Sequence, residues 1–139
     1  MTEQIFHIKN KKEMANLAQK LAKNAKKGDI FTLEGNLGSG KTFFAQEFIN
    51  FFSNKKIDVT SPTFNLLSVY ELEKNNIYHF DLYRLKDEEE LFNLGIEDAL
   101  IDGITLIEWP ELAKDFLKNP IKIYIEIIQE EERLVKLFD

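Results

Sequence analysis

The octapeptide Gly-Asn-Leu-Gly-Ser-Gly-Lys-Thr at residues 35–42 constrains the fold of this chain more than any other feature. It matches the pattern G-x-x-x-x-G-K-[ST] of phosphate-binding loops, whose glycines let the backbone turn tightly and bring its N–H groups to phosphate oxygens. Lys41 is placed to neutralise the β- and γ-phosphates of a nucleotide, and the Thr42 hydroxyl to ligate Mg²⁺. The residues expected to bind the nucleotide here are Asn36, Leu37, Gly38, Ser39, Gly40, Lys41, Thr42 and Phe43.

The flanking segments have the context that such a loop requires. Residues 30–33 form a short apolar run typical of a strand, and residues 42–52 carry apolar side chains at helical spacing. A helix that begins at the loop directs the positive end of its dipole toward a bound anion. The order strand, loop, helix therefore predicts an α/β nucleotide-binding domain.

Composition excludes several other classes of protein. The chain has 139 residues, 44% of them hydrophobic, so we expect one domain over residues 1–139 with a single core. It has no Cys, which excludes disulfides, thiolate metal sites and a cysteine nucleophile. No apolar run approaches the ~18 residues of a membrane span, and the N-terminus lacks a signal-peptide pattern. We expect a soluble, cytoplasmic protein.

The net charge of −6 is unevenly distributed along the chain. Residues 1–56 carry ten Lys and five acidic side chains, whereas residues 57–139 carry eight basic and nineteen acidic ones. The Lys side chains of residues 9–27 could form a small basic stripe that binds nucleic acid. We favour the alternative that they are the solvated face of a helix. The acidic second half fits a protein partner better than direct RNA binding.

Hydrophobic periodicity predicts the other elements. Helices are expected at residues 12–25, 42–52, 87–92, 96–101 and 110–117, and strands at 4–8, 30–33, 57–59, 64–72, 76–82, 104–107, 121–128 and 133–138. Residues 64–82 and 121–138 have the pattern of hairpins. The sum is an α/β sandwich of the P-loop NTPase type, with a mixed, mostly parallel central sheet and antiparallel edge strands.

Two carboxylates follow predicted buried strands. Asp81 follows residues 77–80, and Glu108 follows residues 104–107. In open α/β sheets, nucleotides bind in the crevice beyond the carboxyl ends of the strands. We expect one carboxylate to hold Mg²⁺ and the other to ligate it as well or to polarise the attacking water. The spacing leaves open which of them contacts the metal.

Three further features lie near these strands. The hydroxyls of Thr60 and Thr63, within Thr-Ser-Pro-Thr at residues 60–63, either sense the γ-phosphate or belong to an ordinary Ser-Pro turn. We interpret His79 as a packed strand histidine in preference to a base. Trp109, the only Trp, lies either in the core or along the nucleotide site.

Missing motifs favour ATP over GTP. Residues 54–57 lack the Asp of the guanine motif N-K-x-D, and residues 81–84 lack the Gly of D-x-x-G. Small-molecule kinases of this fold commonly hold phosphates with several Arg on a lid, and this chain has only Arg84 and Arg133. We therefore favour a nucleotide-driven switch. A stand-alone small-molecule P-loop kinase and a nucleotide-dependent scaffold remain the alternatives.

The order of the motifs resembles the bacterial TsaE (YjeE) family. The segments that carry the resemblance are GNLGSGKT at 35–42, SPTF at 61–64, HFDLYRL at 79–85, LGIEDAL at 94–100 and IEWPE at 107–111. The resemblance implies a small Mg²⁺-dependent ATPase that is required for threonylcarbamoyladenosine formation in tRNAs reading codons that begin with A. It implies the TsaD and TsaB proteins, which form the transferase, as partners, and tRNA as an indirect partner through that complex; whether the chain also touches tRNA itself stays open.

The same resemblance implies roles for individual residues. Lys41 and the loop amides would hold the phosphates, Thr42 and Glu108 would hold Mg²⁺, and Asp81 would be the Walker B-type acid. Residues 60–63 would form a switch-like loop. The residues implied near the active face or a partner contact are Trp109, Tyr83 and Arg84. The departures are mild: Asn36 stands where the family usually has Asp, and Ser39 where it often has Ala.

Overall fold

The computed structural model describes residues 2–53, 56–60 and 62–139. Over these residues, seven strands form one sheet in the order β1-β7-β6-β2-β5-β4-β3. The strands are β1 (Glu3–Ile8), β2 (Ile30–Glu34), β3 (Leu67–Glu71), β4 (Asn76–Asp81), β5 (Ile104–Glu108), β6 (Ile121–Gln129) and β7 (Glu132–Phe138). The helices are α1 (Lys11–Lys23), α2 (Lys41–Phe51), α3 (Glu88–Asn93), α4 (Ile96–Asp102) and the 3-10 helix η1 (Pro110–Phe116).

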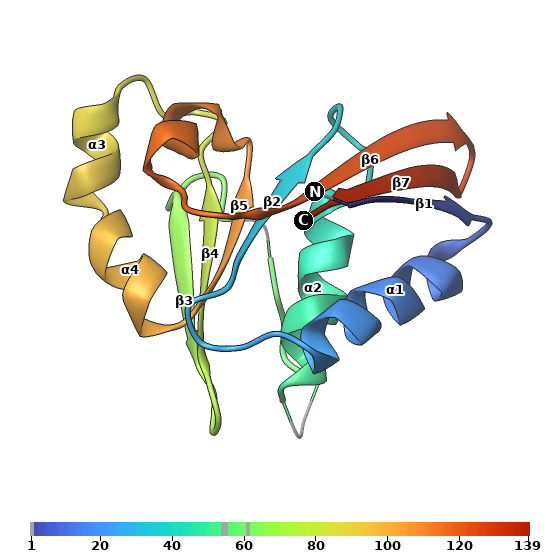
Figure 1. Cartoon of the computed structure of the whole chain (residues 1–139), viewed down its shortest axis with the longest axis horizontal. Coiled ribbons are helices and arrows are strands. Elements are labelled where there is room, and N and C mark those ends of the chain that lie inside the picture. Colours follow the sequence, from blue (N-terminus) through green and yellow to red (C-terminus); the bar gives the residue numbers. More distant parts are fainter. Residues whose placement is uncertain (1, 54–55, 61) are drawn as a thin grey trace.

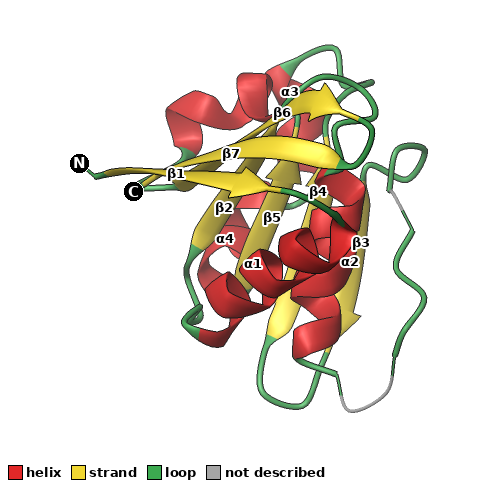
Figure 2. Cartoon of the chain, turned by 90° about the vertical axis from the view of Figure 1, so that its right-hand side faces the viewer, coloured by secondary structure: helices red, strands yellow, loops and turns green. Residues whose placement is uncertain are grey.

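The sheet is parallel at its centre and antiparallel at both edges. Strands β6, β2, β5 and β4 run parallel, whereas β3 pairs antiparallel with β4, and β7 pairs antiparallel with both β6 and β1. The predicted mixed α/β architecture is therefore confirmed. Strand β5 lies between β2 and β4, so the ends of these three parallel strands meet at one edge of the sheet (Figure 2).

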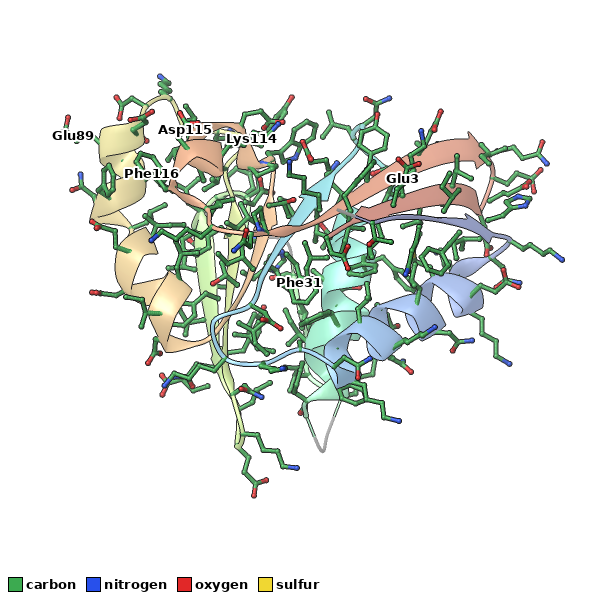
Figure 3. The ribbon with its side chains drawn as sticks, in the orientation of Figure 1. Glu3, Phe31, Glu89, Lys114, Asp115 and Phe116 are labelled. Carbon is green, nitrogen blue, oxygen red and sulfur yellow. The ribbon has the colours of Figure 1, made fainter. Side chains whose placement is uncertain are left out.

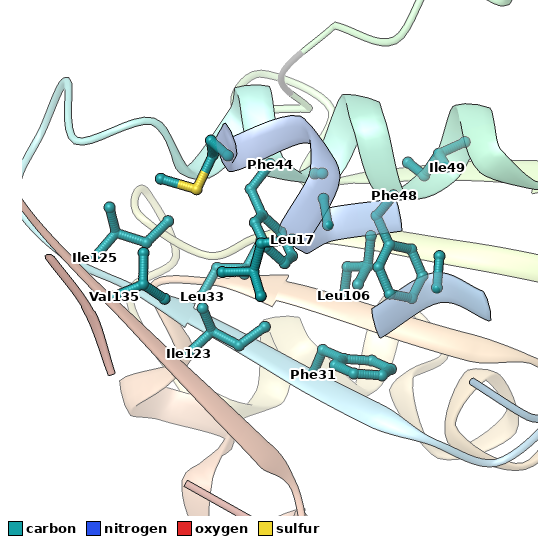
Figure 4. Close-up of a cluster of buried hydrophobic side chains, with 14 of the residues drawn as sticks. Leu17, Phe31, Leu33, Phe44, Phe48, Ile49, Leu106, Ile123, Ile125 and Val135 are labelled. Atoms are coloured by element: carbon teal, nitrogen blue, oxygen red, sulfur yellow. The ribbon is translucent and has the colours of Figure 1, made fainter. Parts of the chain in front are cut away.

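Helices cover the sheet on both faces, α1 and α2 on one and α3 and α4 on the other (Figure 1). The larger core lies under α1 and α2, where Phe44, Phe48 and Ile49 of α2 are fully buried. The Phe31 and Phe48 rings meet edge to face with their centroids 5.0 Å apart. Figure 4 shows these side chains with Leu17, Leu33, Leu106, Ile123, Ile125 and Val135. This packing fixes the helix that begins at the phosphate-loop sequence.

A second core lies on the opposite face, under α3, α4 and η1. Phe80, Leu91, Ile96 and Ile107 are fully buried there. Helix α3 begins as predicted, because the Asp87 side chain accepts a hydrogen bond from the Glu90 N–H. Phe116 of η1 packs against α3 (Figure 3), with its ring centroid 4.9 Å from that of Phe92. Strands β4 and β5 contribute buried side chains to both cores.

The strand predicted at residues 57–59 is wrong. Val59 is buried as expected, but side chains of α2 bind the polar backbone groups of this segment. Gln46 Nε2 donates to the Val59 carbonyl at 2.5 Å, and the Ile57 N–H donates to Asn50 Oδ1 at 2.7 Å. An apolar segment whose backbone is satisfied by side chains does not need a neighbouring strand.

The predicted strand 64–72 starts too early, because residues 64–66 form a turn and β3 begins at Leu67. Leu66 has a φ of 66°, and its N–H donates to the Pro62 carbonyl at 2.5 Å. Phe64 is 83% exposed. Within the motif SPTF, Ser61 lies outside the described residues.

The helix predicted at residues 110–117 is a 3-10 helix that begins at Pro110. In the part of the chain that the structure describes, no helix is both long and apolar enough to cross a membrane.

Candidate functional site

The loop at residues 35–40 joins the end of β2 to the start of α2. Gly40 caps α2 in the left-handed region, with a φ of 108°, so the loop turns directly into the helix. Gly35 has a φ of 147°, and a Cβ atom there would lie 2.4 Å from the Ile125 carbonyl oxygen. From β7, Arg133 Nε donates to the Ser39 carbonyl at 2.8 Å. Residues of β6 and β7, which lie on the same side of β2, therefore pack against the loop.

Lys41 lies inside the loop that precedes it. Its Nζ donates to the carbonyls of Gly35 at 2.6 Å and Asn36 at 2.9 Å, and its side chain is 5% exposed. Burial lowers the pKa of the Lys41 ammonium from its ordinary value of 10.5, and the charges of Glu108, Asp81 and then Glu111 oppose this. A buried ammonium surrounded by turning backbone is suited to an anionic ligand.

Most of the predicted site residues line one pocket of about 270 Å³ at the carboxyl ends of β2, β5 and β4. This is the edge of the sheet where nucleotides bind in open α/β folds. Asn36 and Ser39 contribute backbone carbonyls to the loop and do not line the pocket, and Thr60 is exposed outside it. The lining residues are Leu37, Gly38, Gly40, Lys41, Thr42, Phe43, Thr63, Asp81, Glu108 and Trp109.

Glu108 lies at the centre of a buried hydrogen-bonded chain. The Thr42 hydroxyl donates to its two carboxylate oxygens at 3.2 and 3.4 Å. On its other side, His79 Nε2 lies 2.6 Å from Glu108 Oε2. Hydroxyl and carboxylate oxygens are the ligands that Mg²⁺ prefers. Thr42 and Glu108 therefore form a donor set suited to a hard divalent cation.

Asp81 has a different environment from Glu108. The Thr63 hydroxyl donates to its Oδ2 at 2.8 Å, and the Tyr83 N–H donates to its Oδ1 at 3.0 Å. The two carboxylates occupy opposite positions on neighbouring parallel strands, because Asp81 pairs with Glu108 in the β4–β5 register. Asp81 thus links the strand end to the turn that contains Thr63. The geometry distinguishes two acids that the sequence pattern treated alike.

Trp109 closes the pocket on the side of β5. Its backbone is left-handed, with a φ of 57°, a conformation that costs a non-glycine residue about 1–3 kcal/mol. This turn brings the indole over the Lys41 ammonium, with 4.2 Å between Nζ and the ring centroid. The Tyr83 ring packs against it at 4.8 Å. The structure therefore places Trp109 along the site, one of the two positions left open by the sequence.

Two residues of this site were not identified as functional from the sequence. His79 is fully buried, as expected for a packed strand histidine, but its partner is Glu108. The alternation of β4 places His79 and Asp81 on the same face, a signal that was available. Arg133 supports the loop from 94 residues away, and no local pattern reveals such a contact.

Gly35→Ala is expected to lower the free energy of unfolding by about 1–3 kcal/mol more than Gly28→Ala does, and to weaken nucleotide binding. Both glycines have positive φ, but a Cβ at Gly28 meets no atom within 4 Å, whereas one at Gly35 meets the Ile125 carbonyl. Urea unfolding and calorimetric titration with ADP measure the two effects. Equal losses in the two variants would contradict the steric argument.

Comparisons with known proteins identify the family of this chain. The family model of threonylcarbamoyl adenosine biosynthesis protein TsaE matches residues 8–135. The tRNA threonylcarbamoyladenosine biosynthesis protein TsaE of Rickettsia prowazekii is 44% identical over 131 residues, covering 94% of this chain and 91% of the relative. The protein of the same name from Bacillus subtilis is 36% identical over 126 residues, covering 89% and 78%.

A solved structure extends the similarity to the fold. The crystal structure of Bacillus subtilis YdiB superposes with a TM-score of 0.80 at 28% identity, covering 98% of this chain and 84% of that one. The family model and these relatives cover most of the chain, and the chain belongs to the TsaE family of threonylcarbamoyl adenosine biosynthesis proteins.

Proposed function

We propose that this chain is the Mg²⁺-dependent ATP-binding and ATP-hydrolysing subunit of tRNA threonylcarbamoyladenosine biosynthesis, acting with a TsaD–TsaB transferase. The observation that carries the proposal is the convergence of Lys41, Thr42, Asp81 and Glu108 on one pocket at the carboxyl ends of parallel strands. A phosphate loop binds nucleotide, and a nearby carboxylate pair supplies what hydrolysis requires.

The residues present fit a magnesium ion that arrives with nucleotide phosphates. Among residues 2–53, 56–60 and 62–139, no three His, Asp or Glu side chains are grouped so as to hold a metal by themselves. Mg²⁺ in nucleotide sites is commonly held by one or two carboxylates together with substrate phosphates. Thr42 and Glu108, with Asp81 beside them, would hold it here. When bound, Mg²⁺ supplies charge neutralisation at the β- and γ-phosphates.

Each side chain then has a definite task. Lys41 presents its ammonium to the phosphates, and the backbone N–H groups at the start of α2 face the same anion. Glu108 orients the Thr42 hydroxyl, to which it is already hydrogen-bonded. Asp81 is positioned by Thr63 and the Tyr83 amide, where it can polarise an attacking water. Trp109 covers the ammonium and limits access of bulk water to it.

Exposed side chains around the pocket support a partner-dependent activity. Leu37 is 66% exposed, Tyr83 51% and Phe64 83%. Arg84 lies over the Phe64 ring, with its guanidinium carbon 4.7 Å from the centroid. Exposed aromatic and Arg side chains are enriched where proteins meet. We propose that TsaD and TsaB contact this rim and that tRNA is met only through them.

Steady-state ATP hydrolysis by the purified chain, alone and with TsaB and TsaD, tests the proposal. We expect low activity alone, a clear rise when both partners are added, and loss of both activities in Lys41→Ala. A hydrolysis rate that does not change when the partners are added, together with phosphate transfer to a small metabolite, would contradict the proposal and favour a stand-alone kinase. Nucleotide-dependent assembly without turnover would instead favour a scaffold.

A further inference from the structure

We propose that His79 is the positioning residue of Glu108: its Nε2–H holds one carboxylate oxygen, so that the other is directed toward Thr42 and the metal site. This inference rests on the proposed function, because it assigns the orientation of a carboxylate that we place beside Mg²⁺. It concerns the side chain of β4 that the mechanism above does not use.

The strand register brings the two side chains together. His79 and Asp81 lie two residues apart on β4 and therefore point to the same face of the sheet. Asp81 is opposite Glu108 in the parallel pair, whereas His79 is opposite Leu106. Glu108 thus reaches diagonally down the strand pair to His79, a separation that long side chains can span. His79 Nε2 and Glu108 Oε2 are 2.6 Å apart, and the side chains are 0% and 3% exposed.

The surroundings of the imidazole determine the direction of this hydrogen bond. His79 Nδ1 is buried and has no hydrogen-bond partner among the residues that the structure describes. A carboxylate only accepts hydrogen bonds, so the proton lies on Nε2. His79 is therefore the donor in this hydrogen bond, through its Nε2–H.

The hydrogen bond selects one orientation of Glu108. With Oε2 held by His79, the nearer partner of the Thr42 hydroxyl is Oε1, at 3.2 Å. Without His79, the carboxylate would keep only the Thr42 hydroxyl among these contacts and would be free to rotate. Partners that orient a metal-ligating carboxylate typically change metal affinity by about 10- to 100-fold when removed.

Calorimetric titration of ADP, once with MgCl₂ and once with EDTA, measures this role without relying on turnover. The quantity compared is the ratio of the two ADP affinities. We expect His79→Leu to lower that ratio by about 10- to 100-fold while leaving the affinity in EDTA unchanged. His79→Gln, which keeps an N–H donor of similar reach, should restore the ratio. His7→Leu is the matched control, because His7 pairs with Glu132 away from the pocket.

A ratio that is unchanged in His79→Leu, or is not restored in His79→Gln, would overturn the role given to His79. If His79→Leu does not fold, ¹⁵N NMR of the unsubstituted chain decides the matter, with His7→Gln to assign the two imidazoles. We expect a proton on Nε2 of His79, and an Nε2 without a proton would overturn the inference. If the ADP affinity of the unsubstituted chain does not depend on Mg²⁺, the proposed function itself is contradicted. This outcome distinguishes failure of the proposed function from failure of the role given to His79.

Discussion

Replacing Lys41 with alanine is expected to lower kcat/KM for ATP by at least about 100- to 1,000-fold, the loss typical of removing one group that stabilises charge in a transition state. The ammonium is held by the Gly35 and Asn36 carbonyls and by the indole of Trp109, so its position is fixed before phosphate arrives. No other cation lines the pocket among the described residues. A coupled assay of ADP release measures the effect.

Lys114→Ala is the matched control for that variant. Lys114 lies on η1, is half-exposed, and pairs with Glu34 at 3.4 Å, so the same substitution removes a surface ion pair of little energetic value. We expect its turnover to equal that of the unsubstituted chain. Retained hydrolysis in Lys41→Ala, with the protein folded, would show that the phosphates are bound elsewhere.

Glu108→Gln is expected to lower kcat by about 100- to 1,000-fold while ADP affinity in EDTA stays nearly constant. The amide has the shape of the carboxylate but not its charge. The phosphate loop should therefore still bind the nucleotide, whereas Mg²⁺ loses a charged ligand. Asp81→Asn should also spare binding more than turnover. Its Mg²⁺ response should be affected less, because Asp81 contacts Thr63 and the Tyr83 amide and Glu108 contacts Thr42.

Single-turnover hydrolysis and ADP titrations with and without Mg²⁺ separate these effects. Glu126→Gln provides the control, since Glu126 is an exposed acid on β6 that does not line the pocket. An Asp81→Asn variant that loses its Mg²⁺ response more than Glu108→Gln does would reverse the assignment of the two carboxylates. Equal losses of nucleotide affinity in EDTA would mean that both acids act on loop structure.

The local parts of this fold were predictable because their causes are local. The β2–loop–α2 unit follows from a glycine-rich motif between a strand pattern and a helix pattern, and the β6–β7 hairpin follows from alternation around a turn. Residues 57–59 were wrongly predicted, because hydrogen bonds from α2 side chains satisfy their backbone. The position of β5 between β2 and β4 also depends on long-range packing, which no short window of sequence contains.

The candidate site likewise has features that local sequence predicts and features that depend on the whole fold. Lys41, Thr42, Asp81 and Glu108 could be proposed from a motif and from the rule that acids at strand ends face the nucleotide crevice. Their separate environments could not be predicted, because these depend on which strands are neighbours. Arg133 reaches the loop only because β7 pairs with β6 and β6 with β2. The indole lies over the ammonium only because the backbone at Trp109 is left-handed.

The contact between Lys41 and Trp109 also gives the molecule an optical property. Trp109 is the only Trp in the chain, so all indole emission comes from one ring, which lies 4.2 Å from the ammonium. We expect a phosphate that attracts the ammonium to change the electric field at that ring and, with it, the emission. Under the proposed function, we expect the intrinsic fluorescence of this chain to report on the occupancy of its phosphate loop, so that nucleotide exchange could be followed in real time without a dye.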